Sequence, residues 1–135
     1  MGINKLYKCM EKKKVNNSQA REAIYNILMK EDDCMTVSDI TKKLSTAYAK
    51  KVSLNTIYRH LTFFAECGLV MVIQDDYKKA YYCITDEKAK AFSICTKCNE
   101  LSKVVNVPEI EILLKKLSKE EFITLHAKCH KCKAV

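Results

Sequence analysis

The chain has 135 residues, with 24 Lys and Arg against 16 Asp and Glu, which gives a formal net charge of +8. This length allows one domain or two small ones, and the positive charge favours a polyanionic partner such as nucleic acid or an anionic membrane. Because we find no apolar run long enough to span a bilayer and no signal peptide, we expect a cytoplasmic protein with no membrane partner. In a reducing cytosol, the eight cysteines indicate metal ligation rather than a disulfide framework.

The first part of the chain predicts three helices. Residues 3–14 carry apolar side chains at helical spacing among lysines, and this basic helix either lies along a phosphate backbone or presents a solvated face. Ser18 can cap a second helix with Ile24 in its core stripe. Thr36 and Asp39 resemble a capping box, with Asp in place of the usual Glu, at the start of a third.

The stretch from Ser53 to Gly68 predicts a further amphipathic helix. Ser53 is a good N-cap residue, and Gly68 can adopt the left-handed conformation that closes a helix. Apolar residues at Leu54, Ile57 and later positions form one face. The opposite face suits base edges and phosphates, although an ordinary surface helix has the same pattern. The candidate DNA-binding residues here are Asn55, Thr56, Tyr58, Arg59 and Thr62.

Two strands follow this helix. Residues 70–73 and 80–84 are rich in β-formers, and the turn-rich segment 74–79 joins them. Three helices followed by a β-hairpin predict a winged helix-turn-helix, with Lys78 and Lys79 at the wing tip as candidate phosphate contacts.

We place residues 1–85 in this DNA-binding domain, 86–91 in a hinge, and 92–135 in a small second domain, which makes the fold class α+β. A piece of about 45 residues cannot bury enough surface to be stable without a staple or a partner. Its expected elements are a strand at 92–94, a strand at 102–107, a helix that starts at Pro108 and is capped by Asn106, and a last strand at 121–126.

Two C-x-x-C knuckles supply the staple, and residues 99–128 separate them. Two residues between cysteines let both thiolates face one ion, and two knuckles complete a tetrahedral four-sulfur shell for one structural Zn²⁺ per chain. Asn99 follows the first knuckle, where a left-handed residue is often needed. The alternatives are a redox dithiol or an iron–sulfur cluster. The proposed ligands are Cys95, Cys98, Cys129 and Cys132.

In combination, these motifs resemble the ferric uptake regulator family, which includes peroxide sensors and zinc uptake regulators. The resemblance implies a homodimeric bacterial transcription regulator that binds a double-stranded DNA operator through an N-terminal winged helix, with a C-terminal α/β dimerisation domain. It also implies a structural zinc and a second, regulatory metal at the hinge. The sequence offers no motif of a nucleophilic enzyme. The resemblance rests on Ser18-x-x-Arg21-x-x-Ile24, Thr36-x-x-Asp39-Ile40, Asn55-Thr56-Ile57-Tyr58-Arg59-x-Leu61, Gly68-Leu69-Val70 and Ile94-Cys95-x-x-Cys98.

The sequence departs from this family at the expected regulatory metal. Residues 88–92 replace a histidine-rich run, Cys34 replaces a histidine, and Cys83 and Lys103 replace acidic residues. Lysine is not a metal ligand at these sites, so the usual hinge site is dismantled. We therefore expect regulation to be metal-independent or linked to thiols.

The remaining cysteines have two possible roles. By resemblance, Cys34 and Cys83 converge on the hinge, where they could bind a soft metal or form a disulfide, but the expected role of each is a small buried apolar residue. Cys9 and Cys67 are expected in that apolar role too, and Lys103 can simply be solvated. The alternative function is a thiol-based redox protein that uses the C-x-x-C cysteines.

Overall fold

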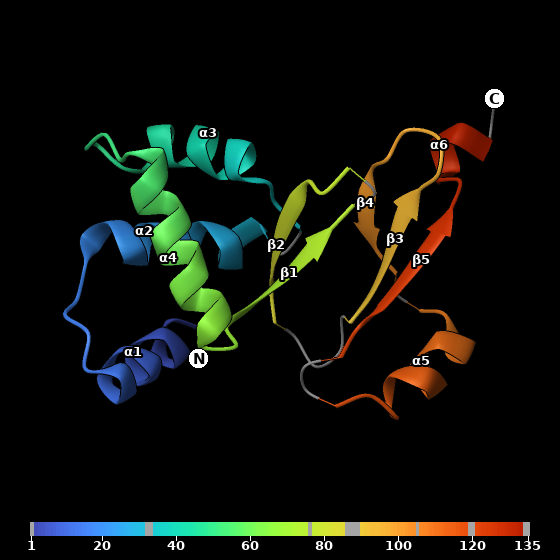
Figure 1. Ribbon diagram of the computed structural model, residues 1–135, viewed down its shortest axis with the longest axis horizontal. Coiled ribbons are helices and arrows are strands. Elements are labelled where there is room, and N and C mark those ends of the chain that lie inside the picture. Colours follow the sequence, from blue (N-terminus) through green and yellow to red (C-terminus); the bar gives the residue numbers. More distant parts are fainter. Residues whose placement is uncertain are drawn as a thin grey trace. The chain divides into compact units, whose positions relative to one another are not determined.

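The computed structural model describes residues 2–31, 34–75, 77–85, 90–104, 106–118 and 121–133 (Figure 1). They form two compact units. Unit 1 comprises Met1–Ile73 with Ala80–Ile84, and unit 2 comprises Gln74–Lys79 with Thr85–Val135. The tip of the hairpin therefore belongs to unit 2. The division into residues 1–85, 86–91 and 92–135 stays a prediction. Across the described residues, none of the helices is long and apolar enough to cross a membrane.

Unit 1 contains four helices and a two-stranded antiparallel hairpin, which is the element order that the sequence predicts for a winged helix (Figure 1). Helix α2 contacts α1, α3, α4 and β2 and so lies at the centre of the unit. The elements are α1 (Gly2–Lys13), α2 (Gln19–Glu31), α3 (Val37–Ala47), α4 (Leu54–Glu66), β1 (Val70–Gln74) and β2 (Ala80–Ile84).

The predicted helix ends are confirmed by their hydrogen bonds. The Thr36 hydroxyl accepts from the Asp39 amide, and the Asp39 carboxylate accepts from the Thr36 amide, each at 3.1 Å, so that Asp completes the capping box. The Ser53 hydroxyl accepts from the Thr56 amide at 3.2 Å. Gly68 follows α4 with a φ of 72°, a conformation that glycine adopts without a steric cost.

The core of unit 1 is built from the predicted apolar stripes, with two differences. Ile57 in α4 is fully buried, but Leu54 is 56% exposed and does not widen the apolar face of that helix as expected. Tyr25, which was not predicted as a core residue, is only 1% exposed. Its ring packs edge-on against that of Phe64, with the ring centres 5.3 Å apart. Such aromatic pairs add to the free energy that burial alone provides.

Unit 2 is a three-stranded sheet with two short helices (Figure 1). The central strand pairs antiparallel with β4 and parallel with β5, and Cys95 lies opposite Ala127 in the parallel pair. A parallel pair needs a crossover connection, which β4 and the following helix provide. The elements are β3 (Ala91–Cys95), β4 (Leu101–Lys103), α5 (Pro108–Leu114), β5 (Ile123–Ala127) and α6 (His130–Lys133).

The segment before α5 differs from the prediction. Strand β4 ends at Lys103 instead of continuing to residue 107. Pro108 occupies the start of α5 as expected, but Val107 is the N-cap residue and makes no side-chain cap hydrogen bond. Asn106 has a φ of 61° and does not cap the helix. The reason is that proline drives the preceding residue into an extended conformation, and this places the helix boundary at Val107.

The apolar face expected on α5 is not buried in this chain. No side chain of this helix is buried, and Ile112 and Leu113 are 60% and 51% exposed. On the neighbouring β5, Leu125 is 38% exposed, and Phe122 just before that strand is 37% exposed. Unit 2 therefore presents large apolar side chains to solvent.

Disulfide bonds join two cysteine pairs of unit 1, Cys9 with Cys67 and Cys34 with Cys83. The expectation that Cys9 and Cys67 are separate apolar residues is therefore wrong, and for Cys34 and Cys83 the disulfide that was left open as an alternative is found instead of the favoured apolar role. For the second pair the cause is an isolated antiparallel bridge, in which Met35 and Tyr82 exchange both backbone hydrogen bonds. The next residues along form a pair without hydrogen bonds, for which a Cα separation of about 4.5 Å is usual. The observed Cα separation is 4.5 Å.

Candidate functional site

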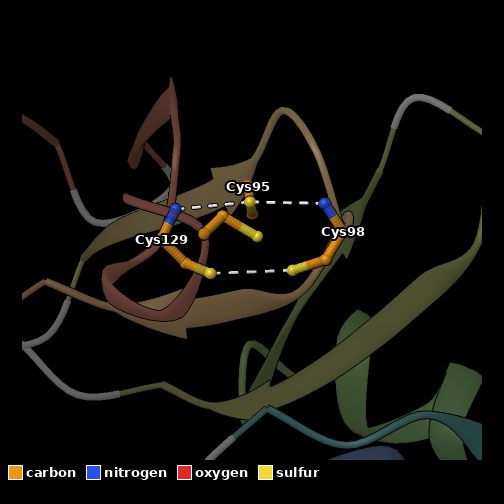
Figure 2. A group of neighbouring side chains, drawn as sticks. Cys95, Cys98 and Cys129 are labelled. Carbon is orange, nitrogen blue, oxygen red and sulfur yellow. Dashed lines mark hydrogen bonds between the residues drawn. The ribbon is translucent and has the colours of Figure 1, made fainter. Parts of the chain in front are cut away.

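The four cysteines of the two knuckles converge at one end of the unit 2 sheet (Figure 2). Cys95 ends β3, and Cys129 follows β5. Because β3 and β5 are parallel, their carboxyl ends lie side by side, and a hydrogen bond of 3.2 Å from the Thr96 amide to the Ala127 carbonyl closes that edge. All four sulfur atoms lie within 4.8 Å of one another.

Backbone amides surround one sulfur of this cluster. The Cys95 sulfur accepts hydrogen bonds from the amides of Cys98 and Cys129 at 3.3 Å each (Figure 2). It also accepts from the Lys97 amide at 3.4 Å. These donors, above all the amides of Cys98 and Cys129, lower the pKa of the Cys95 thiol to about 5. Hydrogen bonds to the Cys129 and Cys95 sulfurs raise the pKa of Cys132 to about 12. A metal that binds these cysteines as thiolates must displace the protons that the cluster still carries.

The sulfur geometry fits a tetrahedral metal. A zinc ion with four bonds of about 2.3 Å places its sulfurs about 3.8 Å apart, and the sulfurs of Cys98 and Cys129 are 3.7 Å apart. Within the described residues, this is the one group of three or more potential ligands close enough to share an ion. The neighbouring His126 and His130 are not part of it. The four-cysteine cluster thus fits a structural metal.

The predicted DNA-binding residues on α4 have different settings. Asn55, Arg59 and Thr62 are exposed, and Tyr58 is 48% exposed. Thr56 is only partly exposed, because the Ser53 cap accepts from its amide and lies 2.9 Å from its hydroxyl oxygen. Its side chain therefore takes part in capping α4, which the sequence analysis did not anticipate.

Arg21 on α2 adds a second guanidinium beside Arg59. Its Cζ lies 4.7 Å from the centre of the Phe63 ring, and its Nη1 donates to the Asn16 carbonyl at 2.9 Å. The two arginines line a hollow of about 380 Å³, together with His60, Thr62, Phe63 and Glu66. Burial, with the charges of Arg21 and Arg59, lowers the pKa of His60 to about 4. His60 is therefore neutral at pH 7. The sequence did not predict that Arg21 and Arg59 lie side by side; its only signal was that Arg21 belongs to the family-like motif Ser18-x-x-Arg21-x-x-Ile24.

The wing-tip turn, Gln74–Lys79, is organised around one buried carboxylate. Asp75 is 6% exposed, and its Oδ1 accepts from the amides of Tyr77 at 2.8 Å and Lys79 at 2.9 Å. Its Oδ2 accepts from the Asn99 side-chain amide at 2.6 Å. The predicted phosphate contacts Lys78 and Lys79 are both exposed, and Lys78 has a φ of 64°.

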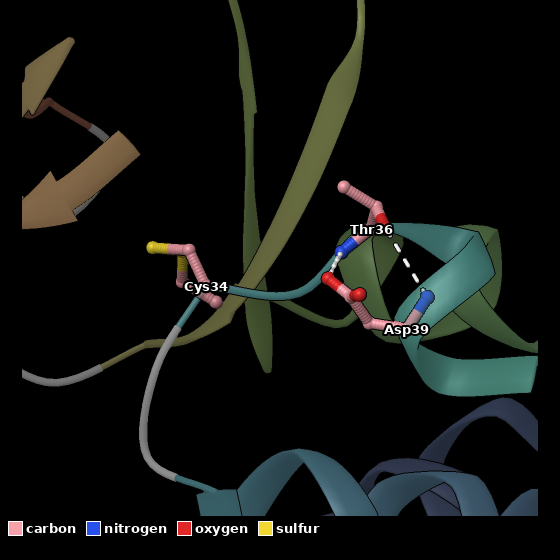
Figure 3. The surroundings of a disulfide bond; sticks show 4 residues. Cys34, Thr36 and Asp39 are labelled. Carbon is pink, nitrogen blue, oxygen red and sulfur yellow. Dashed lines mark hydrogen bonds between the residues drawn. A yellow bond between two sulfur atoms is a disulfide. The ribbon is translucent and has the colours of Figure 1, made fainter. Parts of the chain in front are cut away.

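Two of the three predicted regulatory residues are joined within unit 1, and the third belongs to unit 2. Cys34 and Cys83 form their disulfide beside the capping box of α3 (Figure 3), whereas Lys103 lies in β4 of unit 2. In the run that replaces the histidines, Lys88 and Ala89 lie outside the described residues. Lys90 is 7% exposed and donates from Nζ to the Ser118 carbonyl at 2.9 Å, so it has a structural partner.

Comparison with known proteins places this geometry in a wider context. A sequence model of the Ferric uptake regulator family matches residues 12–134. The ferric uptake regulator from Pseudomonas aeruginosa, solved with manganese, is similar with a TM-score of 0.72 and 26% identity over 90% of this chain and 95% of that chain. No curated protein sequence matches.

Two further solved structures share the fold. The ferric uptake regulator Fur of Helicobacter pylori has a TM-score of 0.77 and 21% identity over 97% of this chain and 91% of that chain. The regulator from Francisella tularensis, solved with iron, has a TM-score of 0.67 and 24% identity over 87% and 94%. The α+β class, with an N-terminal winged helix followed by a small C-terminal α/β domain, is thereby confirmed.

Proposed function

Because this chain belongs to the ferric uptake regulator family, we propose that it is a cytoplasmic, homodimeric transcription regulator, not an enzyme, that binds operator DNA through α4. The observation that carries this proposal is the outward face of α4. That face offers an amide, a guanidinium and a hydroxyl, on a helix whose other face is anchored by fully buried side chains such as Ile57. A recognition helix needs such rigid support, since its base contacts depend on position.

In the proposed complex, α4 lies in the major groove. Arg59 can donate two hydrogen bonds to guanine, Asn55 can pair with adenine, and Tyr58 and Thr62 lie on the same accessible face. The wing-tip lysines contact phosphates, which supplies affinity but no sequence information. The net charge of +8 supports such an electrostatic contribution.

We propose that the four-cysteine cluster holds one structural zinc ion per chain. Zinc prefers a closed tetrahedral shell of thiolates in structural sites, and the small core of unit 2 gives the ion a structural purpose. The convergence of all four sulfurs also disfavours the redox alternative, which needs only one C-x-x-C pair with an accessible thiolate.

The exposed apolar side chains of α5 and β5 support a dimer formed through unit 2. Ile112, Leu113 and Leu125 are 60%, 51% and 38% exposed. A second copy of the chain would cover the same patch on both protomers, as a two-fold interface requires. Several large apolar side chains left exposed within one small unit are a feature that subunit interfaces explain.

We propose that operator binding does not require a regulatory metal. The disulfide between Cys34 and Cys83 removes two potential thiolate ligands at the hinge positions that the family resemblance assigns, and Lys103 brings a cation. The regulatory signal is then the state of that cysteine pair. A peroxide or a disulfide exchange partner takes two electrons and two protons from the two thiols as the sulfur–sulfur bond forms, and a dithiol returns them.

The test of the proposal is a selection of double-stranded DNA from a random pool with the purified zinc-loaded dimer. A regulator enriches one two-fold symmetric sequence whose half-sites are a helical turn or a multiple of it apart. The Arg59→Ala variant serves as the control and should lose this enrichment while keeping its zinc. If the wild-type protein enriches no sequence over the starting pool, the proposed function is wrong.

A further inference from the structure

The wing-tip turn and the first cysteine knuckle are joined by one short hydrogen bond. The Asn99 side-chain amide donates to Asp75 Oδ2 at 2.6 Å, and both residues belong to unit 2. Asn99 directly follows Cys98 in sequence, so a candidate metal ligand and a candidate DNA-binding turn are connected through two side chains.

On the wing side, Asp75 determines the shape of the turn. Besides the two amides that its Oδ1 accepts from, its own amide donates to the Lys79 carbonyl at 3.1 Å, and its carbonyl accepts from the Lys78 amide at 3.0 Å. The backbone of Tyr77, Lys78 and Lys79 is therefore fixed by one residue. A buried carboxylate needs hydrogen-bond donors, and the Asn99 side-chain amide supplies one of those that Asp75 receives.

On the knuckle side, Asn99 is held in an uncommon conformation. Its φ is 63°, and its amide donates to the Cys95 carbonyl at 2.9 Å. The sulfur of Cys95 also accepts a hydrogen bond, from the amide of Cys98. The direction of the Asn99 side chain is thus a consequence of the knuckle conformation, which a bound metal would hold rigid.

From this chain of contacts we propose that Asn99 is a positioning residue for DNA binding: through Asp75 it holds Lys78 and Lys79 in the geometry that meets the phosphates. The inference rests on the proposed function, because it concerns the same wing–phosphate contact. It gives the four-cysteine site a second role besides stapling unit 2, since the conformation of the knuckle is passed on to the turn that carries the lysines.

The variant that tests the proposal is Asn99→Gly, which removes the side-chain donor and keeps the left-handed backbone. The matched control is Asn106→Gly, because Asn106 is also in unit 2, has a φ of 61° and is exposed. Both variants carry the same loss of a side chain and the same gain in unfolded-state freedom. Zinc content and dimer mass are measured first and should match those of the wild type.

The first readout is amide hydrogen exchange at Tyr77 and Lys79, whose amides donate to Asp75, and it needs no DNA. We expect exchange at these two amides to be at least tenfold faster in Asn99→Gly and unchanged in Asn106→Gly. Equal protection in both variants would overturn the proposal, because the turn would then hold its shape without Asn99.

The second readout is the salt dependence of operator binding. Each phosphate contact contributes about 0.9 to the slope of log K against log salt, so Asn99→Gly should lower the slope by about 1–2 and weaken binding about three- to tenfold at low salt. The Lys78→Ala/Lys79→Ala pair should then have little further effect in the Asn99→Gly background, because residues in one network are not additive. Full additivity would contradict the proposal.

A donor–acceptor exchange provides the rescue. The double variant Asp75→Asn/Asn99→Asp reverses the hydrogen bond and keeps an oxygen for the Tyr77 and Lys79 amides, whereas Asn99→Asp alone places two carboxylates together. We expect the double variant to recover the protection and the salt slope that Asn99→Asp alone loses. A different result would separate this inference from the proposed function. If Lys78→Ala/Lys79→Ala leaves the operator affinity of the wild type unchanged, but Asn99→Gly still speeds amide hydrogen exchange, the proposed wing–phosphate contact is wrong although Asn99 does hold the turn through Asp75.

Discussion

The sulfur atoms of Cys9 and Cys67 are bonded to each other, so α1 is covalently joined to the residue that ends α4. The bond spans 58 residues of sequence and encloses α2, α3 and most of the unit 1 core. It therefore constrains the unfolded chain more than it adds contacts to the folded one.

We predict that removal of this bond destabilises unit 1. The free energy of unfolding of the Cys9→Ser/Cys67→Ser variant should be about 2–4 kcal/mol lower than that of the oxidised wild type. The reason is that the bond closes a long loop and so lowers the entropy of the unfolded chain. Urea unfolding followed by helical circular dichroism measures the difference. With a dithiol reductant present, the same difference should largely disappear, and a variant as stable as the oxidised protein would contradict the prediction.

The α4 prediction separates base reading from phosphate contact. Arg59→Ala should weaken binding to the selected operator by about 1–3 kcal/mol, since a guanidinium that reads a base is lost, with little change in unfolding. Lys78→Ala should weaken all DNA sequences alike and lower the salt slope by about 1. Titrations against operator and scrambled DNA distinguish the two. A wild-type affinity for Arg59→Ala would remove α4 from the interface.

The metal prediction concerns assembly. Cys132→Ser removes one ligand and should unfold unit 2 and release the dimer, because the unit has a small core. Sedimentation and a zinc assay on the same sample measure both effects. Lys131→Ser, one residue away, is the matched control and should remain a zinc-loaded dimer. A folded Cys132→Ser dimer with full zinc occupancy would rule out the four-thiolate site.

Operator binding is predicted to be independent of added metal ions. Protein that carries only structural zinc should bind with the same affinity with and without Mn²⁺, Fe²⁺ or Zn²⁺, since a ligand can shift an equilibrium only through differential affinity for two states. If the Cys34–Cys83 pair is the switch, oxidation should change the affinity and Cys34→Ser should abolish that change. Binding that requires a stoichiometric added ion would mean that a regulatory metal site exists.

The pKa of His60 predicts a pH dependence of stability. In the folded protein this pKa is lowered to about 4, whereas an unfolded histidine has a value near 6.5. The unfolded state therefore binds more protons between these values, and stability falls as the pH decreases through this window. With allowance for solvent screening, the loss from pH 7 to pH 5 should be about 1 kcal/mol.

The control for His60 is His60→Gln, which cannot titrate. Urea unfolding of unit 1 at the two pH values, at equal zinc content, should give the extra loss only in the wild-type protein. An equal loss in both proteins would assign the pH dependence to other groups.

The local elements could be predicted from the sequence because their signals are local. The capping box at Thr36, the cap at Ser53 and the left-handed Asn99 each depend on residues a few positions away, and all three are found in the structure. The convergence of the four cysteines was predictable as well, because two cysteines separated by two residues can bind the same ion, and two such pairs complete its four-sulfur shell.

The failures came from contacts that local patterns do not carry. The Cys9–Cys67 and Cys34–Cys83 pairs are separated by 58 and 49 residues. No local pattern marks the first pair, and only the family resemblance suggested the second. The Asp75–Asn99 contact spans 24 residues of sequence, which is also beyond the reach of a local pattern. Asn106 was misjudged as a cap because proline at the next but one position controls Val107 more strongly than a capping side chain does.

The four cysteines also act on the pairing of the strands that carry them. A slip of β5 along β3 by one residue would move it by about 3.3 Å and turn its side chains to the opposite face. Cys129 and Cys132 would then be out of reach of an ion held by Cys95 and Cys98, since the sulfurs around zinc must lie about 3.8 Å apart. If the cluster holds the proposed zinc, a chain with misaligned strands could not retain the ion, and binding of the metal would select the correctly paired sheet during folding.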